Sequence, residues 1–167
     1  MIDEINLKIL RILQQKARVP NVEVARQVNM APSAVLERIR KLEKQGLIDG
    51  YEVILNPKCF NRDMVAFAHI YIEKNSEVDS VGKTLAAIPE IQEIHFISGN
   101  DCFLVKIRVS GKEALRDTLT RKISPIQAVT HTKTHVVLQT FKESSQIPLD
   151  SVDIGEIVEN HSYPKEL

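Results

Sequence analysis

Apolar residues near the start of the chain recur at the three- and four-residue intervals of an amphipathic helix. Ile5, Ile9 and Leu13 share one face, which predicts a first helix. Its first turn can be capped by Asp3 or Asn6, because short polar side chains accept hydrogen bonds from the free amides of a helix N-terminus. This helix is expected to be the first of three in a small helical domain.

Residues 21–50 continue with two helices that meet at a tight turn. Ala25, Asn29 and Val35 place a small residue where the helices touch, a residue tolerant of positive φ at the turn, and an apolar anchor on the second helix. Pro32 suits the first turn of that second helix, because proline has no amide proton to leave unpaired. The pattern predicts a helix-turn-helix. The alternative is an ordinary amphipathic hairpin of helices with a solvated charged face.

The residues after this hairpin predict a wing. Gly46 ends the second helix, and Leu47–Leu55 is expected to form one or two short strands that turn at Asp49 and Gly50. A polar stretch then runs to Asp63. We interpret residues 51–63 as a linker strand and connector.

The second half of the chain alternates between strand and helix patterns. The two helices between the predicted strands follow the segments Ser76–Asp79 and Ser110–Glu113, both of which resemble a capping box. The order is βαββαβ, the ferredoxin-like split unit. The four strands are predicted at Met64–Glu73, Ile91–Ser98, Phe103–Val109 and Val129–Phe141.

The predicted sheet has two unlike faces. In the third strand Phe103 and Val105 point one way and Lys106 and Arg108 the other. One face is expected to take both helices. The other needs a partner sheet, because apolar side chains are left on it, among them Val65, Phe67 and Tyr71.

These elements together predict an α+β protein with an N-terminal winged helix-turn-helix and a C-terminal ferredoxin-like domain. The predicted boundaries are 1–50 for the helix-turn-helix domain, 51–63 for the linker strand and connector, 64–142 for the ferredoxin-like domain, which is expected to mediate oligomerisation, and 143–167 for an acidic C-terminal tail. Within the tail, Val152, Ile154, Ile157 and Val158 allow either a short amphipathic helix on a neighbouring subunit or a solvated acidic tail.

Charge is distributed unevenly along the chain although the formal net charge is zero. Residues 1–60 carry ten basic and seven acidic side chains, and residues 143–167 carry one basic and six acidic ones. The negative charge of the tail therefore offsets a small positive charge on the rest of the chain. So small an excess gives weak affinity for a phosphate backbone, and binding to double-stranded DNA needs two or more copies of the domain. We expect a homo-oligomer.

Several other classes of protein are not indicated. The two cysteines, Cys59 and Cys102, show no pairing or metal-ligand spacing, which favours a reducing compartment. The start of the chain lacks the pattern of a signal peptide, and no apolar run is long enough to span a membrane. His131 and His135 lie about 13 Å apart on one strand, too far for a shared ion. We expect a cytoplasmic protein with no metal, no cofactor and no catalytic residues.

The polar side of the second helix of the hairpin is the predicted DNA-reading surface. A helix face with short polar and basic side chains beside the turn suits the major groove, where each base pair presents a distinct pattern of donors and acceptors. Contacts to the phosphates fix the register without reading sequence. The predicted base readers are Ser33, Ala34, Glu37, Arg38 and Lys41, and the predicted phosphate contacts are Arg26, Arg40 and Lys44.

The whole arrangement resembles the Lrp/AsnC family of bacterial and archaeal transcription regulators. The matching stretches are IDEINLKIL, NVEVARQVNMAPSAVLERIRKLEKQGLI, SGND and THVVL. The resemblance covers residues 1 to about 145. It implies dimers formed through the ferredoxin-like domains, which often assemble into octamers. It also implies small effectors, typically amino acids, bound at subunit interfaces near the hairpin at Gly99.

The chain departs from the family pattern at several positions. Pro20 and Ala31 stand where the family usually has hydroxyl residues that cap helices, and an alanine cap costs about 1 kcal/mol, so a less stable head is predicted. Two acidic residues are usual where this chain has Asp3 and Asn6. At the hairpin the family pattern is Gly, then Asp or Asn, then any residue, then Asp. Here Gly99, Asn100 and Asp101 are followed by Cys102, so the second acidic residue is missing or shifted by one position.

The hairpin offers the chemistry that an amino acid requires. A glycine turn presents amide donors to a carboxylate, and Asp101 can accept from an ammonium group. The alternative is a tight turn without a ligand. The predicted effector-binding residues are Ser98, Gly99, Asn100, Asp101 and Cys102.

A different function on the same architecture is that of the sirohaem decarboxylases, which also resemble this chain. Such an enzyme needs a basic pocket with a histidine, for which His95 and Arg108 are available. The chain has no Trp and lacks the Asn-Leu-Trp type of strand associated with those enzymes. No phosphate loop, metal motif or nucleophile triad is present. A regulator is therefore the predicted function.

Overall fold

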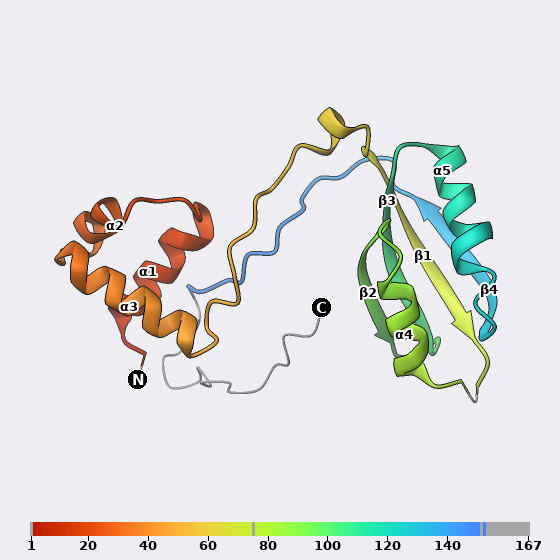
Figure 1. Cartoon of the computed structure of the whole chain (residues 1–167), viewed down its shortest axis with the longest axis horizontal. Coiled ribbons are helices and arrows are strands. Elements are labelled where there is room, and N and C mark those ends of the chain that lie inside the picture. The colour runs from red at the N-terminus through yellow and green to blue at the C-terminus, as the bar shows by residue number, and fades with distance from the viewer. Residues whose placement is uncertain (1, 75, 151, 153–167) are drawn as a thin grey trace. The chain divides into compact units, whose positions relative to one another are not determined.

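The computed structural model describes residues 2–74, 76–150 and 152, and they form two compact units. One unit, here called the head, consists of residues 2–54 and the described residues from Ser144 on. The other, the sheet unit, is Leu55–Glu143 (Figure 1). The chain therefore passes from one unit to the other twice, once after Ile54 and again after Glu143.

The head contains the three predicted helices, α1 (Glu4–Gln15), α2 (Asn21–Val28) and α3 (Pro32–Lys44). At the predicted turn Asn29 adopts the left-handed conformation, with φ of 54°. The apolar positions singled out by helical spacing meet in one core. Its buried members are Ile9, Leu13, Val24, Ala25, Val35, Ile39 and Leu42.

Only one of the three helices has a side-chain cap. Asp3 is the N-cap of α1, and its Oδ1 accepts a hydrogen bond of 2.8 Å from the Asn6 amide. Pro20 precedes α2 and Ala31 precedes α3, and neither provides a side-chain acceptor. The expected absence of both caps is confirmed. Gly46, with φ of 68°, follows α3.

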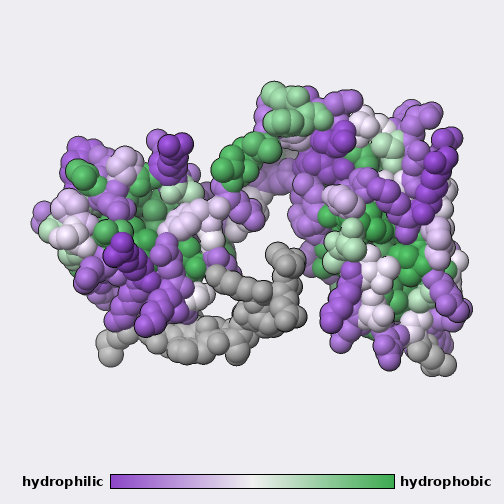
Figure 2. All heavy atoms as spheres, in the orientation of Figure 1, coloured by the Kyte–Doolittle hydropathy of each residue, from purple (hydrophilic) through white to green (hydrophobic). Residues whose placement is uncertain are grey.

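The predicted wing strands are not formed. Residues 48–56 have no regular secondary structure, and Val53 and Ile54 are 84% and 93% exposed. An isolated strand pair is stable only when one of its faces is buried, and this segment has no such cover in the single chain. Figure 2 shows hydrophobic side chains along the linker that leaves α3.

The sheet unit has the predicted βαββαβ order. A 3-10 turn, Pro57–Phe60, precedes the antiparallel sheet, whose strand order is β2-β3-β1-β4. The elements are β1 (Met64–Ile72), α4 (Val78–Ala86), β2 (Ile91–Ile97), β3 (Cys102–Val109), α5 (Lys112–Asp117), which continues as the π-helical segment Thr118–Ile123, and β4 (Val129–Val136).

The first three strands have the predicted bounds to within one residue, whereas the helix starts and the end of the last strand differ from the predictions. Neither helix has a capping box, because each begins one residue later than expected, with Glu77 and Gly111 rather than the preceding serines at the N-cap. The last strand ends at Val136 instead of Phe141. Its neighbour β1 begins at Met64 and is already paired with the chain up to residue 137, so the residues beyond have no strand to pair with.

The two faces of the sheet differ as expected. Ala66, Ala68 and Ile70 of β1 are fully buried in the core that α4 and α5 cover. The alternate positions form what we call the open face, where Phe67 is 36% exposed. By the strand register this face also carries His69, Tyr71, Leu104, Lys106, Arg108, His131, Lys133 and His135.

Candidate DNA-reading and effector-binding sites

Helix α3 presents the predicted DNA-reading residues on its accessible side. Its inward side is fixed by Val35, Ile39 and Leu42, so Ser33 and Glu37 are left exposed. A groove runs along this side of the helix against the start of α1. The groove is lined by Asp3, Asn6, Ala34, Glu37, Arg38, Lys41, Leu42 and Gln45. The structure therefore brings four of the five predicted base readers to one groove, with Ser33 exposed nearby on the first turn.

Arg38 is held by α1 and does not project freely from the groove. Its Nη1 donates to Oδ2 of Asp3 at 2.6 Å and to Oδ1 of Asn6 at 2.8 Å, and its side chain is 29% exposed. Partial burial raises the pKa of the Asp3 carboxyl, but the Asn6 amide and the Arg38 guanidinium outweigh this and hold it below the usual value. Arg38 thus ties the recognition helix to the N-terminus of α1.

The predicted phosphate contacts fall into two groups. Arg40 and Lys44 are exposed on α3. Arg26 on α2 is engaged by Glu23, whose carboxylate lies 2.8 Å from its Nη2 and also accepts from the side chain of Gln27. Contact between Arg26 and a phosphate would therefore have to compete with this ion pair.

Tyr51 ties the start of the linker to the C-terminal half of α3. The Tyr51 hydroxyl donates to Oε1 of Glu43 at 2.9 Å. Burial, together with this hydrogen bond to a carboxylate, raises the pKa of Tyr51 to about 12. The phenol is therefore protonated, and able to donate, throughout the neutral range.

The predicted effector hairpin is a tight turn between β2 and β3. Gly99 has φ of 89° and Asp101 φ of 46°, so both lie in the left-handed region. Ser98, Asn100 and Asp101 are exposed, whereas Cys102 is completely buried. Burial and the nearby Asp101 charge raise the pKa of the Cys102 thiol. Four of the five predicted effector contacts are thus accessible at the turn, and the Cys102 side chain is enclosed.

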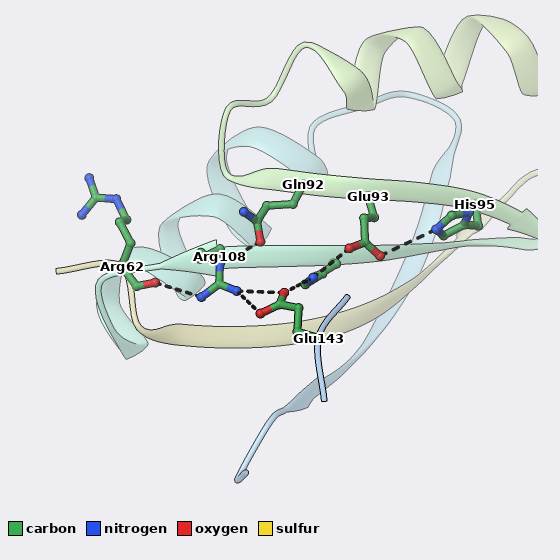
Figure 3. A network of polar contacts seen from close by, with 7 residues as sticks. Arg62, Gln92, Glu93, His95, Arg108 and Glu143 are labelled. Carbon is green, nitrogen blue, oxygen red and sulfur yellow. Dashed lines mark hydrogen bonds and ion pairs between the residues drawn. The ribbon is translucent and has the colours of Figure 1, made fainter. Parts of the chain in front are cut away.

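A polar network that the sequence did not indicate lies on the open face (Figure 3). Glu143 bridges two cations of β3, since its carboxylate is bound by Lys106 Nζ and accepts from Arg108 Nη2 at 3.0 and 3.1 Å. Lys106 also binds Glu93 at 2.7 Å, and Arg108 donates to Gln92. The Lys106 and Arg108 side chains are only 11% and 14% exposed.

This network also bears on the decarboxylase alternative. Arg108, one of the two residues considered for a tetrapyrrole pocket, is occupied by Glu143 and Gln92. The other, His95, lies 3.8 Å from a carboxylate oxygen of Glu93 (Figure 3).

Elsewhere on the open face the rings of Tyr71 and His131 stack with centroids 4.1 Å apart.

The described residues lack two further features. In residues 2–74, 76–150 and 152 there is no cluster of three or more His, Cys, Asp or Glu side chains placed to hold a metal ion. None of the described helices has the length and apolar character needed to cross a bilayer.

The two units match two protein-family models. Residues 2–49 match a winged helix-turn-helix DNA-binding family, and residues 65–147 match the Lrp/AsnC ligand binding domain. The leucine-responsive regulatory proteins of Klebsiella pneumoniae and Escherichia coli are 33% identical to this chain over 148 residues, which is 87% of this chain and 90% of theirs.

Solved structures agree with these matches. Escherichia coli AsnC is 26% identical, has a TM-score of 0.80, and covers 87% of this chain and 98% of its own. A Neisseria meningitidis transcriptional regulator in complex with L-Met is 24% identical and has a TM-score of 0.85, and it covers 90% of this chain and 98% of its own. At this identity the likeness supports the fold alone. With a helix-turn-helix head, a ligand-binding domain and relatives along most of its length, this chain belongs to the Lrp/AsnC family of DNA-binding transcriptional regulators.

Proposed function

We propose that two copies of this chain bind a pseudo-palindromic DNA site, each inserting α3 into the major groove. The observation that carries the proposal is the accessible side of α3, where Glu37 and Lys41 line one groove and Ser33 is exposed on the first turn. A recognition helix reads sequence with residues near its N-terminus, and dimers read two half-sites one helical turn apart.

The contacts of each residue suggest its role. Ser33, Glu37 and Lys41 are accessible donors or acceptors for base edges, and Ala34 offers a methyl group to a thymine methyl. Arg40 and Lys44 are proposed to bind phosphates, and Arg26 to do so when it leaves Glu23. Arg38 is proposed chiefly as a positioning residue, because its Nη1 already binds Asp3 and Asn6. It can contact a base only through Nε and Nη2, the guanidinium nitrogens that do not bind Asp3 and Asn6.

We propose an amino acid as the effector, bound at the Gly99 hairpin. The left-handed turn exposes main-chain amides suited to a carboxylate, and Asp101 is exposed and able to accept from an ammonium group. The L-Met bound by the Neisseria relative supports this class of ligand. Because an exposed turn encloses little of a ligand, the site is proposed to be completed by another subunit.

We propose that the subunits associate through the open face. Phe67, Tyr71 and Leu104 leave apolar surface on one side of an otherwise covered sheet. Packing a second sheet on this surface would bury it and bring two heads onto one DNA site. Each subunit alone carries only a small excess of positive charge in its first 60 residues, so pairing would also raise the affinity.

Recovery of DNA fragments from a genomic pool tests this function. Purified protein is mixed with random genomic fragments at near-physiological salt, with and without the twenty amino acids, and the bound fragments are sequenced. A few discrete pseudo-palindromic sites, altered by amino acids, are expected. Diffuse recovery that disappears with salt would contradict sequence reading.

Variants then assign the roles. Lys41→Ala is expected to weaken binding to the recovered sites more than to random DNA, because it removes a base contact. Lys44→Ala should weaken both alike. Asp101→Ala is expected to abolish the response to amino acids while binding without them is retained. Equal losses for Lys41→Ala on both kinds of DNA would exclude it as a base reader.

A further inference from the structure

The segment after the sheet unit lies along helix α1 of the head. Arg11 Nη2 donates to the Leu149 carbonyl at 2.9 Å, and its Nε lies 3.1 Å from an Asp150 carboxylate oxygen. One turn further along α1, Gln14 contacts Ile147 and Gln146. Residues 146–150 are thus bound by two side chains of one helix.

Most of these contacts are made to the main chain of the segment. The Gln14 side-chain amide accepts from the Ile147 N–H at 2.7 Å and donates to the Ile147 carbonyl at 2.9 Å. This is the two-bond pattern with which one strand residue pairs with another. The Gln146 side chain returns a bond of 3.0 Å to the Gln14 carbonyl. The geometry is that of a specific docking surface for an extended peptide.

Apolar contact accompanies the polar bonds. Leu149 and Val152 are half-buried, while the residues between Lys142 and Pro148 are exposed. Val152 lines a groove on α1 together with Glu4, Leu7, Lys8 and Arg11. The chain therefore lies against α1 through the Val152 side chain as well as through the backbone of residues 147–149.

The other end of the same segment is fixed to the sheet unit. Glu143 is bound by Lys106 and Arg108 on β3 (Figure 3). Only three residues separate Glu143 from Ile147, whose backbone Gln14 binds. We call residues 143–150 the clasp. It is anchored at one end to the ligand-binding domain and at the other to the first helix of the DNA-binding head.

We propose that the clasp is a second tether, which restrains the head on the ligand-binding domain and so prepares the two heads of a dimer for paired half-sites. The first connection, residues 48–56, has no regular secondary structure. A flexible connection loses conformational freedom when both heads bind, and a second anchored connection removes part of that loss beforehand. The DNA part of this inference rests on the proposed function, whereas the docking of residues 146–150 does not.

The test compares two double variants of the full-length chain. Arg11→Ala with Gln14→Ala removes the docking contacts. Gln15→Ala with Lys16→Ala is the matched control, because it removes one amide and one cation from exposed positions at the same end of α1. Hydrogen exchange measured by mass spectrometry on peptides covering residues 144–150 and α1 reports on the contact itself. The docking variant should exchange at least fivefold faster at residues 146–150, with the control unchanged.

Binding to DNA provides the second measurement. Affinity is determined for a recovered two-half-site fragment and for the same fragment with one half-site scrambled. The docking variant is expected to lose about five- to twentyfold on the paired site and less than twofold on the single half-site. The control variant should match wild type on both fragments.

The outcomes separate the possible failures. Unchanged exchange at residues 146–150 would overturn the docking, and faster exchange with unaltered paired-site binding would overturn the restraint. Equal losses on both fragments would also overturn the restraint, since a damaged head weakens every contact alike. If no discrete site is recovered, the proposed function fails, while the exchange experiment still decides whether the clasp is docked.

Discussion

The two units of this chain differ in whether the apolar sides of their helices and strands are buried within the unit. In the head, the apolar sides of α1, α2 and α3 face one another, and one core buries them within a single chain. In the sheet unit, α4 and α5 cover one side of the sheet, and the other side keeps Phe67 and the neighbouring rings accessible. The contrast supports the proposal that the sheet unit, rather than the helical core of the head, associates with a second subunit.

Arginine side chains show the same contrast. Arg38 joins two helices of the head by binding Asp3 and Asn6, so its charge is used inside the unit. Arg108 lies on the open face, where it binds the carboxylate of Glu143 at the start of the clasp. The Arg38 charge links two helices within one folded unit. The Arg108 charge binds a carboxylate from the segment that leaves the sheet unit, on the face that we propose associates with a second subunit.

The largest expected effect follows from charging the open face. Phe67 lies opposite Lys106 of β3 and His135 of β4 in the strand register, so Phe67→Lys would place a cation beside them. A symmetric dimer would contain two such added cations. The dissociation constant of the dimer should rise at least about 100-fold, because unpaired charges resist burial. Sedimentation velocity over a range of concentrations measures the change. Val22→Lys, at a 67% exposed position of the head, is the control and should leave the association unchanged.

A Phe67→Lys protein that associates as tightly as wild type would contradict the proposed association through the open face. The open face would then be an ordinary solvated surface, and the subunits would meet elsewhere. Circular dichroism of the variant distinguishes lost association from lost folding, since the proposal requires a folded monomer.

The sequence predicted the features of the fold that arise from local periodicity. Helical spacing identified the core of the head, and the period of two identified which residues of β3 face the helices. Asn29 at the turn was predictable because few residues tolerate its conformation. The boundaries were less accurate: Ser76 and Ser110 matched capping boxes, but each lies one residue outside its N-cap.

Contacts between distant segments could not be predicted in this way. Arg38 and Asp3 are 35 residues apart, and Glu143 and Lys106 are 37 apart, with no spacing rule to connect them. The docking of residues 146–150 was missed for a different reason. Gln14 binds the backbone of Ile147, which every residue possesses, so the bound segment has no side-chain signature. The sequence left open an amphipathic helix or a solvated acidic tail. Of the residues considered for that helix, Val152 is described, and Ile154, Ile157 and Val158 lie outside the described residues.

A moderate effect is expected from restoring a helix cap in the head. Ala31 is the N-cap of α3 and offers no acceptor to the free amides of the first turn. Ala31→Ser should stabilise the head by about 1 kcal/mol and raise its melting temperature by a few degrees. Ala34→Ser, two residues inside the helix, is the matched control and should be neutral or slightly destabilising. An unchanged melting temperature for Ala31→Ser would show that α3 does not depend on this cap.

The smallest effect concerns the ion pair that joins α1 to α3. Asp3→Asn keeps the N-cap, because asparagine caps as well as aspartate, but removes the charge facing Arg38. Since 45% of the Asp3 side chain is exposed, solvent screening limits the expected loss to about 0.5 kcal/mol at neutral pH. The folded state lowers the pKa of Asp3, so its contribution is present above the ordinary value of 3.8 and is lost as the pH falls through the lower, folded value. Melting curves of both proteins should therefore differ at pH 7 and converge in stronger acid. A difference that persists at low pH would mean that the carboxylate charge is not what binds Arg38 to α1.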